Sequence, residues 1–210
     1  MRLPSKVIVA ATATVVAGVG ALGAGTGSAR TGAPASAAEV KCSVYRGDVK
    51  TLGDPAAANI SDALQPTSVK ALRNLPNPHL TKNDSKRPRM APVEQTIYRM
   101  NVKLVSFKLE KDNDIHVIVA GPVSRKRMIV EFVLPECGKR RQAQMANARF
   151  SLQSRCGVAT RKFQPLQGTA LVTGVGFYDD LHRQKGAAPN GIELHPVLSF
   201  QFTSLFCTHF

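Results

Sequence analysis

Residues Ile97 to Leu109, IYRMNVKLVSFKL, form the stretch of sequence that decides the fold. Apolar residues occupy alternate positions along it: Tyr98, Met100, Val102 and Leu104. This alternation is typical of a β-strand with one buried face, because successive side chains point to opposite faces of a strand. We therefore predict a strand from Ile97 to about Leu109, long enough to bend and to pair at both of its edges.

The chain downstream of this strand alternates between β-rich runs and turn-forming residues. We predict short strands over residues 115–120 and 128–134, separated by a basic turn, and two further strands over residues 169–178 and 192–203. Between Gly138 and Arg155 the β-branched residues disappear and Ala, Gln, Arg and Met dominate, which is typical of a helix. We expect its buried side to consist of Met145, Ala148, Phe150 and Leu152, and its solvent side of Lys139, Arg140, Arg141, Arg149 and Arg155.

The resulting order is mainly β with one helix, β-β-β-α-β-β, and it is typical of an OB-like five-stranded barrel. An α+β sandwich gives the same order and remains an alternative. We assign the barrel domain to residues 93–210. Residues 38–92 are rich in Pro and Gly turns, and we interpret them as a loop-rich N-terminal wrapping segment. Its one helical candidate covers residues 69–75, with Thr67 or Ser68 as the cap.

Residues 1–37 have the three parts of a secretory signal peptide. Arg2 and Lys6 precede an uncharged Ala/Val/Gly run, and Ala35-Ser36-Ala37 matches the small-residue cleavage pattern. We predict cleavage after Ala37, with Ala29 as the alternative. A retained membrane anchor is the competing interpretation, but the run is rich in small residues. We expect a secreted, extracytoplasmic protein with no transmembrane span after signal removal.

Composition limits the possible classes of protein. The chain has 210 residues, 43% hydrophobic and 20% charged, which excludes a wholly disordered chain and a multi-span membrane protein. It carries 28 Lys and Arg against 14 Asp and Glu, a formal net charge of +14. Signal removal would take away three basic residues and no acidic one, so the mature charge would be about +11.

The four cysteines indicate two disulfides, because an exported chain meets an oxidising environment. Four cysteines allow three connectivities. We predict that Cys137 pairs with Cys156, because they flank one helical segment, and that Cys42 pairs with Cys207 to join the two ends of the mature chain. None of the four lies in a C-x-x-C pair, which disfavours zinc and redox sites.

Two segments in the C-terminal third carry a resemblance: TGVGF at residues 173–177 and APNGIELHPV at residues 188–197. With the strand 114–119, which begins acidic-x-His, and MIVE at residues 128–131, they resemble a family of exported, functionally uncharacterised bacterial proteins. The resemblance spans about residues 46–200. It implies a shared architecture and export, and it carries no established activity.

The candidate binding residues are polar side chains on or beside the predicted strands. They are His116, Asp179, His182, Gln184, Asn190, Glu193 and His195. We expect a pocket where the connection 179–195 folds over the barrel end, because loops on a rigid sheet often carry binding groups. Histidine and carboxylate also suit a divalent metal or an acid/base pair. No H-E-x-x-H spacing is present, so we prefer a structural hydrogen-bonding role and expect no metal and no cofactor.

Basic residues form several clusters along the chain. The members that we expect at the surface are Lys82, Arg87, Arg125, Lys126, Arg127, Arg140 and Arg141. A positive surface attracts polyanions, such as nucleic acid, a wall polymer or anionic lipid. We therefore predict a secreted, monomeric, non-catalytic protein that binds a polyanion or a cell-envelope component. The alternative is a metal-assisted hydrolase, such as a secreted phosphodiesterase or nuclease.

Overall fold

The computed structural model describes residues 40–204 and 207. The chain divides into two units, Met1–Ala37 and Ala38–Phe210, and the described residues belong to the second. The predicted signal peptide and both candidate cleavage sites lie outside the described residues.

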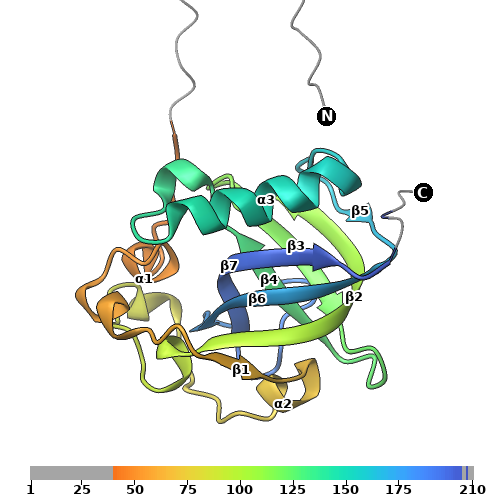
Figure 1. The fold of residues 1–210 in the computed structure, drawn as a ribbon. Coiled ribbons are helices and arrows are strands. Elements are labelled where there is room, and N and C mark those ends of the chain that lie inside the picture. The colour runs from red at the N-terminus through yellow and green to blue at the C-terminus, as the bar shows by residue number, and fades with distance from the viewer. Residues whose placement is uncertain (1–39, 205–206, 208–210) are drawn as a thin grey trace, which may run out of the picture. The chain divides into compact units, whose positions relative to one another are not determined.

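The second unit is mainly β and contains a closed, OB-like barrel of five strands (Figure 1). The barrel strands are β2 (Ile97–Leu109), β3 (Ile115–Ala120), β4 (Arg127–Phe132), β6 (Thr169–Tyr178) and β7 (Ile192–Phe202). Around the barrel the order is β2-β3-β4-β7-β6, and β2 pairs with β6 to close it. β4 and β7 are parallel, whereas the other barrel pairs are antiparallel.

Strand β2 closes the barrel because its two halves have different partners. Its first half, Ile97 to Lys103, pairs with β6, and its second half, Lys103 to Leu109, pairs with β3. A register shift between Leu104 and Ser106 bends it between the two. The predicted bending strand is thus confirmed, and the closed barrel excludes the alternative sandwich.

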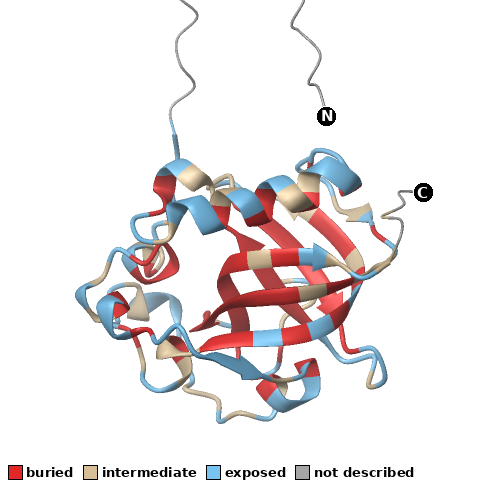
Figure 2. Ribbon diagram, viewed as in Figure 1, coloured by how far each residue is buried: buried red, intermediate tan, exposed pale blue. Residues whose placement is uncertain are grey.

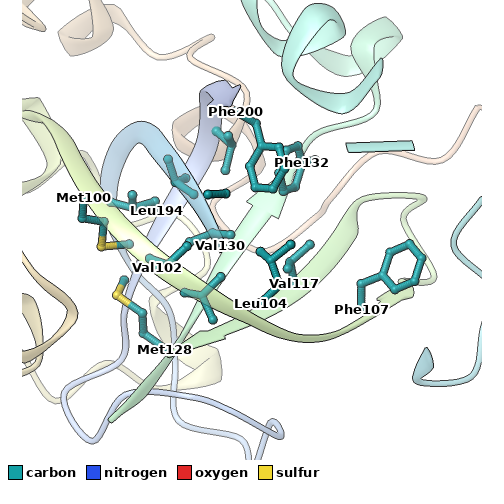
Figure 3. Packing of buried hydrophobic residues seen from close by; sticks show 14 of the residues in the cluster. Met100, Val102, Leu104, Phe107, Val117, Met128, Val130, Phe132, Leu194 and Phe200 are labelled. Carbon is teal, nitrogen blue, oxygen red and sulfur yellow. The ribbon is translucent and has the colours of Figure 1, made fainter. Parts of the chain in front are cut away.

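The barrel interior is filled by apolar side chains from every barrel strand. Figure 3 shows Met100, Val102, Val130 and Leu194 pointing toward one another from β2, β4 and β7. Figure 2 shows buried residues along nearly all of the barrel strands. The only helix of more than two turns in the described residues, α3 (Gln142–Cys156), lies across one barrel end and packs on β7, where Ser151 Oγ donates to Phe200 O at 2.8 Å (Figure 1).

The face of α3 that is buried differs from the predicted one at two positions. Met145, Ala148 and Leu152 are buried as expected, but Phe150 is 73% exposed and Arg149 is 8% exposed. Position 150 lies out of phase with the i, i+3, i+4, i+7 series that starts at Met145, whereas position 149 belongs to that series. Arg149 is accommodated because its Nη1 donates to Phe132 O at 2.9 Å.

The segment before the barrel consists of short elements. They are α1 (Gly47–Lys50), the 3₁₀ turns η1 (Pro55–Asn59), η2 (Lys82–Asp84) and η3 (Val93–Gln95), the strand β1 (Leu64–Pro66) and α2 (Val69–Arg73). Ser68 caps α2 by accepting a hydrogen bond from Ala71 N at 3.1 Å, so Ser68 rather than Thr67 is the cap. Strand β1 adds to the sheet by pairing in parallel with β2.

Two buried ion pairs hold this segment together, and Arg46 also joins it to the barrel by donating from Nη1 to Tyr178 O of β6 at 2.9 Å. Arg46 and Glu94 form a bidentate pair with distances of 2.7 and 2.6 Å, and neither side chain is exposed. Arg89 Nη2 lies 2.6 Å from Asp54 Oδ2 and also donates to Val49 O. A second apolar cluster, which includes Leu52 and Ile97, fills the space between the segment and the barrel.

The predicted disulfide pairing is wrong. The structure joins Cys42 to Cys137 and Cys156 to Cys207. Cys137 and Cys156 lie at opposite ends of α3, whose 15 residues span about 22 Å, far beyond the Cα separation that a disulfide allows. The observed bridges instead attach the N-terminal segment to the β4–α3 connection (with η4, Pro135–Cys137) and the end of α3 to the chain after β7.

Among the described residues, no helix has both the length and the hydropathy needed to cross a membrane.

The remaining strand, β5 (Gln164–Pro165), pairs with Ser106 and Phe107 of β2. It carries the preceding loop, residues 157–163, alongside the turn between β2 and β3, where Leu109 N donates to Thr160 O at 2.7 Å.

Candidate functional site

Six acidic and histidine side chains are buried together against the outer face of the barrel. They are Asp114, His116, Glu131, Asp179, Glu193 and His195, each at most 5% exposed. Val117 and Val130 belong to the barrel interior, so the adjacent His116 and Glu131 point to the opposite face of β3 and β4. We call these six residues the buried cluster.

Glu131 connects the two histidines of the buried cluster. Its Oε1 lies 3.1 Å from His116 Nδ1, and its Oε2 lies 3.2 Å from His195 Nδ1. On the other side of the ring, His195 Nε2 lies 3.3 Å from Asp114 Oδ2. Strand register brings these residues together. His116 pairs with Glu131 across β3 and β4. Ile129, which lies on the same face of β4 as Glu131, pairs with Glu193 of β7.

Several polar atoms of the buried cluster make no hydrogen bond within the described residues. They are both ring nitrogens of His195, Glu193 Oε2 and Asp179 Oδ1. The His195 nitrogens are unpaired although carboxylate oxygens lie close to them. Glu193 Oε2 lies 4.0 Å from His195 Nδ1. Buried polar groups are ordinarily paired, so this grouping of unpaired atoms marks the cluster as unusual.

Lys50 brings a positive charge to the buried cluster from α1. Its Nζ lies 3.9 Å from Asp179 Oδ1 and 5.2 Å from the centroid of the Phe177 ring. Burial by itself would lower the pKa of Lys50, but the charges of Asp179, Glu131 and Glu193 raise it above its usual range. Lys50 is therefore a permanent cation at this place.

The carboxyl groups of the buried cluster differ in acidity. Burial opposes ionisation of Glu131, but the hydrogen bond from His116 and the charges of His195 and Lys50 hold its pKa well below the usual range. Burial raises the pKa of Glu193 well above its usual range, and the charges of Glu131 and Asp179 raise it further. Burial also raises the pKa values of Asp114 and Asp179. Groups with divergent acidity are a feature of functional sites, and also of structural charge networks.

The connection between β6 and β7, residues 179–191, covers the buried cluster. The carbonyl of Lys185 lies 3.2 Å from His116 Nε2, and Gly186 packs so closely on Ile118 that a Cβ at this position would lie 2.7 Å from that side chain. A pocket of about 540 Å³ remains between this connection, the turn after β2 and the segment 43–50. Glu131 and Asp179 lie at its floor and are buried, so the pocket reaches the cluster.

The seven predicted binding residues occupy three different environments. His116, Asp179, Glu193 and His195 belong to the buried cluster. His182 has a half-exposed side chain beside Asp180 and, like Gln184, lines the pocket. The side-chain amide of Asn190 donates to Leu72 O and Leu75 O at 3.0 and 2.9 Å. Asn190 thus anchors the carbonyls at the end of α2, and His182 lies apart from the two buried histidines.

The predicted basic residues are distributed over several places in the fold. Arg125, Lys126 and Arg127 lie at the turn between β3 and β4, at the end of β3 remote from the pocket. Arg140 and Arg141 precede α3, and Arg141 contacts Asp62. Lys82 lies in η2, and Arg87 contacts Asp84 of the same turn.

Sequence reasoning missed three members of the site. Glu131 is the lone acid in the apolar strand MIVEF, and alternation along that strand could have placed it on the face opposite Val130. Asp114 ends the polar run Lys111-Asp112-Asn113-Asp114, which is typical of a turn rather than of a buried site. Lys50 lies in a one-turn helix, and no periodic pattern indicates its burial.

Comparison of the chain with protein-family models, with curated proteins and with solved structures finds no match. The resemblance to exported bacterial proteins therefore stays a prediction.

Proposed function

We propose that this protein is an extracytoplasmic, non-catalytic binding protein whose ligand is a polyanion of the cell envelope. The observation that carries the proposal is the position of the pocket. In OB-folds, the loops after the first and fourth strands flank the ligand-binding face. Here the turn 110–114 follows β2, the first barrel strand, and the connection 179–191 follows β6, the fourth. The pocket thus matches the ligand-binding position of OB-folds at the level of the fold alone.

The distribution of charge around the pocket supports an anionic ligand. Three exposed basic side chains line its opening: Lys111, Arg183 and Lys185. Arg161 adds a positive charge to the neighbouring turn, where its Nη2 donates to Asn113 Oδ1 at 2.9 Å. The acidic residues of the opening, Glu110, Asp112 and Asp180, are all partly buried. A positive rim over a deep acidic floor attracts anionic groups to the opening rather than into the cluster.

Two aromatic side chains lie beside this pocket in the described residues. Tyr45 is partly buried and donates its hydroxyl hydrogen to Thr81 O at 3.2 Å, and Phe163 does not favour single-stranded nucleic acid. Lys108 Nζ and Lys185 Nζ lie 4.9 and 5.0 Å from the centroid of the Phe163 ring, and His116 contacts its edge. A ring covered in this way offers little area for stacking on a base. The two disulfides support the compartment, because such bonds persist in oxidising environments. An anionic wall polymer fits these features better than a nucleic acid.

Binding to heparin, as a polyanion probe, tests this proposal. The variant Lys111→Glu/Arg183→Glu reverses two exposed rim charges, and Lys126→Glu/Lys70→Glu makes the same kind of change at exposed positions away from the rim. We expect the rim variant to lose affinity about tenfold or more at low salt, with a shallower salt dependence, and the control to keep its affinity. Equal losses in both variants would overturn the rim as the binding surface.

A second candidate is a metal-assisted hydrolase, and the contact between pocket and buried cluster favours it. A substrate in the pocket would lie next to Glu131 and Asp179. Hydrolysis of bis(p-nitrophenyl) phosphate in the presence of Zn²⁺, abolished by Glu131→Gln, would favour this candidate over the binding protein. No turnover by a folded protein that retains polyanion binding would exclude it.

A further inference from the structure

We propose that the buried cluster binds one divalent metal ion of the zinc type through Asp114, Glu131 and His195. Each residue offers one donor atom, and the three donor atoms lie within 4.8 Å of one another. One imidazole nitrogen and two carboxylate oxygens form a donor set that zinc accepts in proteins. The inference does not depend on the ligand proposed for the pocket.

One ring nitrogen of His195 would bind the ion, because its two nitrogens point away from each other. Glu131 Oε2 lies 3.2 Å from Nδ1, and Asp114 Oδ2 lies 3.3 Å from Nε2. Ligand atoms of a tetrahedral zinc site with bonds of about 2.0 Å are separated by about 3.3 Å, so one carboxylate is at ligand spacing from its nitrogen and the other would have to shift toward that same nitrogen. Both ring nitrogens are buried and neither has a partner in good hydrogen-bonding geometry.

Each carboxylate of the proposed site has one oxygen held by the protein and the other directed at His195. Asp114 Oδ1 accepts a hydrogen bond from Leu134 N at 2.8 Å, and Glu131 Oε1 lies 3.1 Å from His116 Nδ1. Outer contacts of this kind orient the ligands of metal sites. His116 is in turn fixed by the carbonyl of Lys185, so β3 and the connection 179–191 both support the donor set.

Carboxyl groups outnumber the permanent cations in the buried cluster. Four carboxyl groups are buried there: Asp114, Glu131, Asp179 and Glu193. Two permanent cations act on them, Lys50 beside Asp179 and Arg149 toward Asp114. A divalent ion is one way to supply the balancing positive charge, and protons on the carboxyl groups or on His116 and His195 are the others.

A further donor and an entry path complete the site. Glu193 Oε2 is buried, lacks a hydrogen-bond partner and lies 4.0 Å from His195 Nδ1. A shift of less than about 1 Å would bring this oxygen to ligand spacing. Glu131 lies at the floor of the pocket, which gives an ion a path from solvent. Ligand type, spacing, outer contacts and access are the checkable features of a metal site.

The test has two measurements on the disulfide-bonded protein: its metal content after loading with Zn²⁺ and removal of free metal, and its melting temperature with free Zn²⁺ present. We expect about one zinc per chain, and a rise in melting temperature of about 5–10 °C at a free zinc concentration a hundredfold above Kd. Asp114→Asn should reduce the zinc content at least tenfold. Glu136→Gln, an exposed carboxyl change on η4, should leave it unchanged.

The outcomes separate this site from two other groups of possible ligands among the described residues. They are Asp179, Asp180 and His182, of which His182 is half exposed, and Glu110, His116 and Glu131. Zinc retained in Asp114→Asn but lost in Asp180→Asn or in Glu110→Gln would overturn the proposal. Wild-type protein that stays folded in excess zinc and holds less than about 0.1 zinc per chain would also overturn it. The wild-type measurement keeps the proposal falsifiable even if the Asp114 variant does not fold.

Discussion

The carboxylate of Glu94 joins three segments of the chain, and replacing it by glutamine should strongly destabilise the fold. It accepts hydrogen bonds from Arg46 Nη1 and Nη2 at 2.7 and 2.6 Å. It also accepts from the backbone amides of Met90 and Tyr178 at 2.6 and 2.8 Å. Both partners of the ion pair have a side-chain exposure of 0%. The segment 46–54, the turn before β2 and the end of β6 therefore depend on one carboxylate.

The expected magnitude follows from these four contacts. A glutamine amide keeps one acceptor oxygen, so about two of the four donors would face its NH₂ group. One of the lost bonds involves the Arg46 charge and is worth about 1.5–3 kcal/mol, and the other is worth about 1 kcal/mol. The unpaired, buried guanidinium adds to this loss, and breaking one partner of a buried pair costs about 3–5 kcal/mol. We expect Glu94→Gln to lower the free energy of unfolding by about 3–5 kcal/mol.

Urea denaturation at pH 7, followed by far-UV circular dichroism, measures the effect. The matched control is Asp62→Asn, because the side chain of Asp62 is 87% exposed in its contact with Arg141, and such a pair is worth about 1 kcal/mol or less. In a double-mutant cycle with Arg46→Met, the coupling energy should be about 2 kcal/mol or more. A cost for Glu94→Gln no larger than that of Asp62→Asn would refute the reasoning.

Three further predictions concern titration, backbone geometry and helix orientation. Burial, with nearby carboxylates, raises the pKa of Tyr45 to about 12. Since the unfolded chain loses this proton near pH 10, the stability of the fold should fall above that pH. The chain has three Tyr and no Trp, so absorbance at 295 nm follows tyrosine ionisation, and it should rise near pH 10 by less than three tyrosines would give. Gly191→Ala should lower the free energy of unfolding by about 2 kcal/mol or more, because φ is 74° and a Cβ would meet a backbone carbonyl. The control Gly47→Ala has open space around the new Cβ and should be nearly neutral. Equal melting temperatures of the two variants would contradict this prediction. Leu152→Ala should cost about 2–5 kcal/mol and Phe150→Ala about 0.5 kcal/mol, and equal costs in urea denaturation would contradict the orientation of α3.

The barrel could be predicted from the sequence because its strands carry strong local signals. The alternation in IYRMNVKLVSFKL indicates one buried face, and the structure places β2 at those residues. The loss of β-branched residues after Gly138 marks α3, which begins at Gln142. The predicted burial of Phe150 was wrong, because composition identifies a helix without fixing which of its residues face the sheet.

The disulfides and the buried cluster were less accessible, because they depend on contacts between distant segments. Pairing of Cys137 with Cys156 looked reasonable from their separation, but the helix between them holds the two residues apart. His116, Glu193 and His195 were identified as polar residues on apolar strands. Their convergence depends on Glu131, which lies between them only because β4 pairs with β3 on one side and with β7 on the other.

The covering of the outer barrel face explains why one region holds both a buried cluster and a pocket. The Arg46–Glu94 pair fixes α1 over β6, and the carbonyl of Lys185 fixes the connection 179–191 over β3. Between these two covers the face stays open at the pocket, with acidic groups at the floor and basic groups at the rim. A cation bound in the cluster would reduce the negative potential at the floor and strengthen the attraction of the rim for an anion. The proposed metal and the proposed polyanion would therefore each raise the affinity for the other, because coupling between two sites is reciprocal.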